Sequence, residues 1–155
     1  MIPHLHTAIV ATLVAAAVTL PACKKGTETP AAKSSMNALA HPNETYTVRG
    51  IIETLPDPAD PRTQLTIHHE HIPNFKGKSG NLHVNSDGVT GMKAMTMPFD
   101  TLGPDVMLDQ FQVGDKVEFV LNIAREPTMS MAIVKMTKLP ADTPISFDNK
   151  PNAEP

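Results

Sequence analysis

The sequence predicts an all-β fold, a small five-stranded antiparallel barrel, for the central part of the chain. Five short segments alternate apolar and polar residues with a period of two, which is the spacing of a half-buried strand. Stretches rich in Pro, Asp and Gly separate these segments and are typical of turns. Residues 44–139 are enough for one domain with a modest core. That core rests on aliphatic residues, Met and Phe, because the chain has no Trp and one Tyr.

The first two strands are expected over residues 45–55 and 64–71. In the first, apolar residues alternate along one face and Gly50 stands where a barrel strand would kink. In the second, Leu65 and Ile67 share a face. A turn rich in Pro and Asp lies between the two strands.

The other three strands are expected over residues 94–99, 116–124 and 131–138. The strand at 116–124 has the clearest alternation, and a Gly-Asp turn signal precedes it. Residues 101–112 are the only part of the domain that is expected to hold a helical turn, in which Met107 would pack inward. Five short strands with little helix are typical of a closed antiparallel barrel of the OB type. A small sandwich is the alternative, but so short a sheet has little to pack against except itself.

The N-terminal residues 1–22 are interpreted as a signal peptide. The apolar run at 8–20 has the length of a signal-peptide core and is too short to span a bilayer. It ends at Leu-Pro-Ala-Cys, which resembles the lipobox of bacterial lipoproteins and would place a lipid on Cys23. We therefore expect an exported, periplasmic lipoprotein anchored to the membrane. An ordinary cleaved signal is the alternative.

The two flanks of the domain have no apolar periodicity. Residues 23–43 are expected to be a flexible, lipidated tether, and residues 140–155 a disordered tail. A net charge of −3 and a pI near 6.1 provide no basic surface for nucleic acid. No set of nucleophile, base and acid is recognisable, so we expect a binding protein rather than an enzyme.

Two neighbouring patterns carry the chemistry of the sequence. On the strand at 64–71, His69 shares the inward, apolar face, whereas His68 faces outward. On the strand at 94–99, Met95 and Met97 share a face, and Met92 lies just before the strand. If the two strands are neighbours, one imidazole and three thioethers converge at one end of the barrel.

These ligand types select the metal. Thioether sulfur is neutral and polarisable, so it favours Cu(I) or Ag(I) over Zn²⁺, Mg²⁺ or Ca²⁺. Cys23 is the only cysteine, which excludes a thiolate site within the domain. Other interpretations stay open, because methionine also fills gaps in apolar cores and the histidines could form a solvated patch.

The same residues resemble the CusF-like family of periplasmic copper- and silver-binding proteins. The resemblance rests on Thr-Ile-His-His-Glu at 66–70, on Met-Thr-Met-Pro-Phe at 95–99 and on the turn at 113–117. It implies a five-stranded OB-like barrel in which His69, Met95 and Met97 bind Cu(I) or Ag(I).

The chain departs from that family at two points. Met92 stands where the family has a Trp that caps the metal, so a further sulfur could replace the ring. The connection between His69 and Met95 is longer, and it contains the auxiliary ligand candidates His71 and His83. The implied function is a metallochaperone or a sequestering protein for copper homeostasis or resistance, with a copper efflux protein or a cuproprotein as its partner. A membrane-anchored OB-type interaction module that binds no metal is the alternative.

Overall fold

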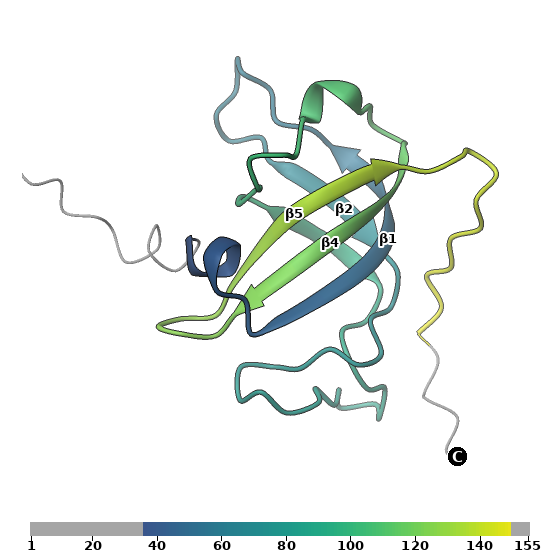
Figure 1. Ribbon diagram of the computed structural model, residues 1–155. Coiled ribbons are helices and arrows are strands. Elements are labelled where there is room, and N and C mark those ends of the chain that lie inside the picture. The colour runs from purple at the N-terminus through teal and green to yellow at the C-terminus, as the bar shows by residue number, and fades with distance from the viewer. Residues whose placement is uncertain (1–35, 150–155) are drawn as a thin grey trace, which may run out of the picture.

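The computed structural model describes residues 36–149 and confirms the all-β fold (Figure 1). Five antiparallel strands form one sheet, and the strand bounds lie close to the expected ones. A single short 3-10 helix, η1, lies between the third and fourth strands. The elements are β1 (Glu44–Thr54), β2 (Leu65–His69), β3 (Met95–Phe99), η1 (Leu108–Gln110), β4 (Lys116–Ala124) and β5 (Ser130–Lys138).

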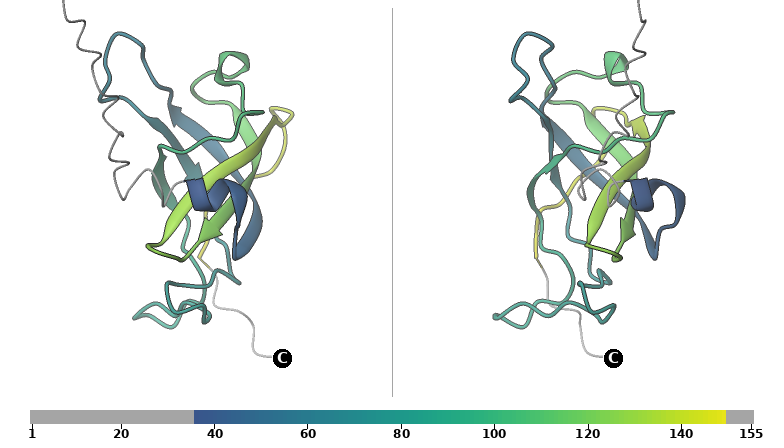
Figure 2. Two further views of the ribbon diagram at one scale, coloured as in Figure 1. Left: turned by 60° about the vertical axis from the view of Figure 1, so that its left-hand side comes forward. Right: turned by 90° about the vertical axis from the view of Figure 1, so that its left-hand side faces the viewer.

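The sheet has the strand order β3-β2-β1-β4-β5, and it curls so that its two edges approach each other (Figure 2). Just beyond β3, the backbone N–H of Gly103 donates to the carbonyl of Ile133 in β5 at 2.7 Å. The N–H of Ile133 donates in turn to the carbonyl of Thr101 at 3.1 Å. The two edges therefore meet beyond the end of β3, although the sheet is not closed along its whole length. The shape is that of a small OB-like barrel.

The core lies inside the curled sheet and follows from the alternation of the strands. Residues at every second position of β1 and β2 are buried, whereas their neighbours are more exposed. β4 alternates in the same way up to its last four residues, which are all buried. Full burial of one such aliphatic or aromatic side chain contributes about 1.5–3 kcal/mol. The largest completely enclosed apolar side chains are Phe119, Ile52, Leu65, Ile67, Leu121, Ile123, Ile133 and Val117.

Gly50 allows β1 and β2 to approach each other closely. A Cβ atom at this position would lie 2.5 Å from the carbonyl oxygen of His68 and 2.6 Å from a methyl carbon of Ile67, so a side chain does not fit. Further along β1, the pairing with β2 shifts register between Ile52 and Thr54. A bulge of this kind increases the local twist and helps the sheet to curl.

The two ends of the barrel carry different loops. The long connection from β2 to β3 and the turn from β4 to β5 both lie at the lower end in Figure 1. The connection from β1 to β2 lies at the opposite end with η1. The helical turn expected within 101–112 is thus present, but Met107 does not pack inward as expected. It is 52% exposed, because it precedes η1 in an extended conformation that directs it away from the core.

The last residues of the expected tether contact the barrel. Residues 36–40 form a helical turn, and Ala38 is completely buried against Ala124 and Ala132 of β4 and β5. The side-chain amide of Asn37 donates to the carbonyl of Glu126 at 2.6 Å. Small alanine side chains permit this close contact. The expected signal peptide, Cys23 and the rest of the expected tether lie outside the described residues.

The described part of the expected C-terminal tail also lies against the barrel. We call residues 140–149 the C-terminal strap. The ring of Phe147 stacks on that of His68, with 4.0 Å between the ring centroids. The backbone N–H of Ser146 donates to the carboxylate of Glu70 at 2.8 Å. In residues 140–149, an aromatic ring and one backbone donor thus find partners on or next to the outer face of β2.

Candidate metal centre

The pairing of β2 with β3 brings the candidate ligands of the two strands together. His69 lies directly opposite Met95, and Ile67 lies directly opposite Met97. Directly opposed residues share a face of the sheet, with Cβ atoms about 4.5–5.5 Å apart, and diagonal neighbours are about 7–8 Å apart. The imidazole of His69 is therefore the direct neighbour of one candidate thioether and the diagonal neighbour of the other. Both lie within the reach of long side chains.

His69 is the least satisfied polar side chain of this region. It is only 1% exposed, and its Nδ1 lies 2.7 Å from the carbonyl oxygen of Glu70. Because a carbonyl only accepts, this contact assigns the proton to Nδ1 and leaves the lone pair on Nε2. That Nε2 atom is buried, and no described residue bonds to it. An unpaired buried acceptor of this kind costs about 1–3 kcal/mol, which a ligand can offset.

The surroundings of His69 also favour its neutral form. Burial lowers the pKa of His69 below the ordinary value of histidine, and the charge of the adjacent His68 lowers it further. The hydrogen bond to the Glu70 carbonyl raises the pKa; it is a weaker influence than burial but a stronger one than His68. A neutral imidazole with a free Nε2 lone pair is the form that binds a metal ion.

The two methionines of β3 differ in exposure. Met97 is half-buried and packs against the core, whereas Met95 is 47% exposed. β3 is an edge strand of the sheet, so a side chain near its first residue is open to solvent even on the inward face. The thioether of Met95 therefore lies at the surface of the site and that of Met97 lies deeper.

Met92 is held in place by backbone contacts rather than by a strand. Its N–H donates to the carbonyl of Ile72 at 3.0 Å, and the N–H of Ile72 donates back at 2.9 Å. The preceding Gly91 has φ +81°, and a Cβ atom there would lie 2.0 Å from the Ile72 carbonyl oxygen. Only glycine fits this position. Met92 is consequently fixed beside the buried Ile72, partly buried, and close to the start of β3.

A cavity of about 420 Å³ opens at this end of the barrel. Met92 and Met95 line it together with His83, one of the auxiliary candidates. Met129, from the turn between β4 and β5, lines it as well. No local signal could have identified Met129, because its proximity to β3 depends on how the sheet curls. The full lining is Phe75, Gly77, Lys78, His83, Asn85, Met92, Lys93, Met95 and Met129.

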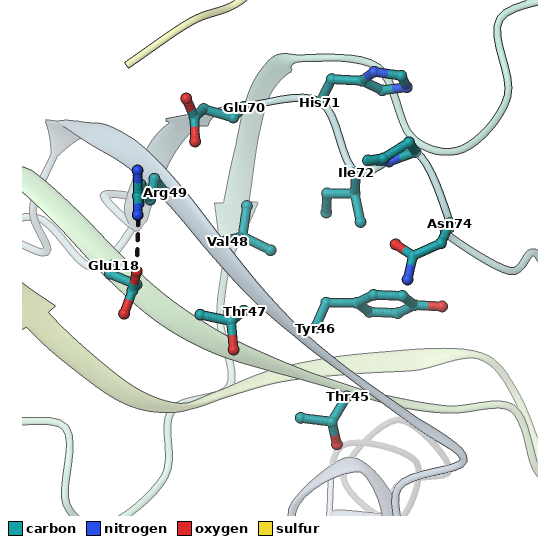
Figure 3. A pocket seen from close by; sticks show the side chains of 11 residues that line it. Thr45, Tyr46, Thr47, Val48, Arg49, Glu70, His71, Ile72, Asn74 and Glu118 are labelled. Carbon is teal, nitrogen blue, oxygen red and sulfur yellow. Dashed lines mark hydrogen bonds and ion pairs between the residues drawn. The ribbon is translucent and has the colours of Figure 1, made fainter. Parts of the chain in front are cut away.

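The structure does not bring His71 to the methionines. Its Nε2 lies 2.6 Å from the carbonyl oxygen of Thr90, to which it donates. His71 lines a different, polar hollow of about 430 Å³ beside β1 (Figure 3). In that hollow it lies near Ile72 and Asn74, across from the side chains of β1. His71 is therefore placed apart from the candidate centre.

His68 faces outward, as its position on β2 predicts. Its Nδ1 lies 3.4 Å from a carboxylate oxygen of Glu53, and its ring stacks on Phe147. In residues 36–149, no three His, Cys, Asp or Glu side chains gather as metal ligands. Within the same range, no helix is long and apolar enough to cross a membrane.

Comparisons of the chain with protein-family models, with curated proteins and with solved structures gave no match. The donor set itself is one imidazole nitrogen and a group of thioethers, all of them neutral. Such a set suits a soft monovalent ion better than a hard divalent one.

Proposed function

We propose that this protein binds Cu(I) or Ag(I) through His69 together with Met95, Met97 and Met92. The observation that carries this proposal is the buried Nε2 of His69, which has no partner among the described residues and stands opposite Met95 on the neighbouring strand. An ordinary core histidine would have both ring nitrogens paired, because unpaired buried acceptors are costly. A metal ion would satisfy this atom, and the adjacent thioethers would complete its coordination.

The exposure of the ligands favours a carrier over a permanent metal site. Met95 is half-exposed at the edge of the sheet, so an incoming ligand from another molecule can replace it first. The deeper ligands, Met97 and His69, would follow in turn. Exchange of neutral ligands one at a time needs no large conformational change. We propose a metallochaperone or a sequestering protein for copper homeostasis.

The proposed location of this activity is outside the cytoplasm. The apolar run at 8–20 and the cysteine that follows it support export and lipid attachment at Cys23. Thioether ligands suit an oxidising compartment, in which thiolates are converted to disulfides. A copper efflux protein or a cuproprotein of the same compartment is the proposed partner.

An anaerobic titration of Cu(I) against a chromophoric chelator tests the proposed function. The full chain carries Cys23→Ser in this experiment, so that its thiol does not compete for the ion. We expect one tight site, and we expect His69→Ala or Met97→Ile to weaken it by about tenfold or more, since each removes a direct ligand.

His68→Ala is the matched control, because its ring is the neighbour of His69 in sequence but faces outward. It should leave the Cu(I) affinity unchanged. Circular dichroism of each variant separates a lost ligand from a lost fold. If the parent protein does not compete with the chelator, the metal proposal is wrong and the interaction module remains. Equal weakening by the His68 and His69 variants would place the ion elsewhere.

A further inference from the structure

The cavity at the open end of the barrel contains soft donor atoms that the proposed site does not use. His69 does not line this cavity, whereas a second histidine, His83, does. Met129, in the turn between β4 and β5, lines it too. Met92 and Met95 are common to both places, because both line the cavity and belong to the proposed site, where Met95 stands opposite His69.

The position of His83 is fixed by its backbone. Its N–H donates to the carbonyl of Phe75 at 3.0 Å, and its own carbonyl accepts from the N–H of Gly91 at 2.7 Å. Phe75 is itself buried in the core, so the loop is anchored where His83 stands. Despite this anchoring, the imidazole of His83 is exposed and has no hydrogen bond to any residue of the described range. The ring is thus held at the cavity and is available to a ligand.

The second donor, Met129, lies in the turn between β4 and β5. It immediately precedes β5, and its side chain is partly buried against the core. The structure therefore presents a nitrogen and a sulfur donor from two loops that meet only in the folded protein. Cu(I) and Ag(I) accept two such neutral donors, whereas a hard divalent ion requires oxygen ligands and a larger coordination number.

The charges at the cavity disfavour a divalent cation more than a monovalent one. Lys78 and Lys93 both contribute to the lining. The ammonium group of Lys93 is paired with the carboxylate of Asp87, which leaves Lys78 as the exposed cation. Electrostatic repulsion grows with the charge of the ion, so a divalent cation would be disfavoured about twice as strongly as a monovalent one.

We propose that this cavity is a second, outer site for a soft monovalent ion, with His83 and Met129 as its own ligands. The thioether of Met95 lies between the outer site and His69 and passes the ion from one to the other. The identity of the ion rests on the proposed function, but the outer ligands do not. The outer site is exposed and has two ligands, so it binds more weakly than the inner one and fills second.

The test follows silver binding through the methionine methyl groups. The full chain with Cys23→Ser is prepared with carbon-13 in these methyl groups, and Ag(I) is added stepwise while NMR spectra are recorded. Coordination of a thioether moves the resonance of its own methyl group. We expect the first equivalent to move Met97, and the second to move Met129. Mass spectrometry under non-denaturing conditions should count two bound ions.

Two variants separate the sites. Met129→Leu with His83→Gln should abolish the second equivalent, raising its dissociation constant about tenfold or more, and leave the first unchanged. His69→Ala should weaken the first equivalent and leave the Met129 response in place. Met107→Leu is the control, because Met107 is exposed and lies outside the cavity.

Each outcome decides between the sites. A single bound ion that moves Met97 but never Met129 would overturn the outer site and leave the proposed function intact. A first equivalent that moves Met129 and not Met97 would overturn the two-site arrangement. If no methionine responds to Ag(I), both the outer site and the proposed function are wrong.

Discussion

At the scale of single residues, the chemistry of this protein depends on the protonation of His69. Its Nδ1 proton is held by the Glu70 carbonyl, and Nε2 is left as a buried lone pair. Burial lowers the pKa of this ring, so the neutral form persists to lower pH than in a free histidine. A proton and a metal ion compete for the same nitrogen. A lower pKa means that the nitrogen binds the proton less tightly, so the proton competes less well with the metal ion.

The Cu(I) affinity of the inner site should therefore change little with pH. A single histidine with the ordinary pKa of about 6.5 would lose about fourfold in affinity between pH 8 and pH 6. His69 should lose less than this, because its pKa is lowered and thioethers do not titrate. Chelator competition at both pH values measures the ratio. A loss of tenfold or more would indicate several imidazole ligands.

At the scale of elements, the segment between β2 and β3 holds its methionine by a close backbone approach. Gly91 and Gly88 both have positive φ angles, of +81° and +83°. They differ in their surroundings, since a Cβ atom at Gly88 meets nothing within 4 Å, and one at Gly91 meets the Ile72 backbone. Alanine variants at the two positions therefore distinguish the cost of the left-handed backbone conformation from the cost of a steric clash.

Gly91→Ala should be clearly more destabilising than Gly88→Ala. The alanine at position 88 should cost about 1–2 kcal/mol, the price of the left-handed conformation alone. At position 91 the chain must also move away from Ile72, which displaces Met92 and weakens Cu(I) binding. Chemical denaturation gives the two free energies of unfolding, and the chelator titration gives the affinities. Equal effects of the two variants would show that Met92 does not depend on this contact.

At the scale of the whole molecule, the described parts of the two flanking segments, residues 36–43 and 140–149, contact the barrel. The helical turn at 36–40 covers one part of β4 and β5, and the C-terminal strap covers the outer face of β2. The strap also reaches β3, because the side-chain oxygen of Asn149 accepts from the N–H of Ala94 at 2.7 Å. Ala94 immediately precedes Met95. The strap thus supports the candidate centre from its outer side.

Removal of residues 140–155 should lower the stability of the domain by on the order of 1 kcal/mol, because it removes the ring contact of Phe147 with His68 and leaves the N–H of Ala94 and the carboxylate of Glu70 without these hydrogen-bond partners. Thermal unfolding measures the loss. Removal of residues 150–155 alone is the matched control and should have no effect, since it leaves the strap in place. If both truncations melt like the full chain, the strap contributes nothing to the fold.

The strand pattern and the choice of donor atoms follow from the sequence alone. Alternation with a period of two is a local property, so it correctly placed β4 and assigned His69 to the inward face and His68 to the outward one. The soft character of the donors is likewise a property of the residue types. Contacts between distant segments are not local, and only the tertiary structure decided them.

The curl of the sheet brought Met129 to the cavity, and the course of the long loop placed His83 there and His71 elsewhere. The contacts of the strap at 140–149 likewise could not be predicted from local sequence. Its sequence has too little apolar periodicity to predict order, and its order depends on partners that β2 and β3 supply. Local sequence determines which face of a strand a side chain occupies, whereas the surface that it then meets is determined by chain segments far away in sequence.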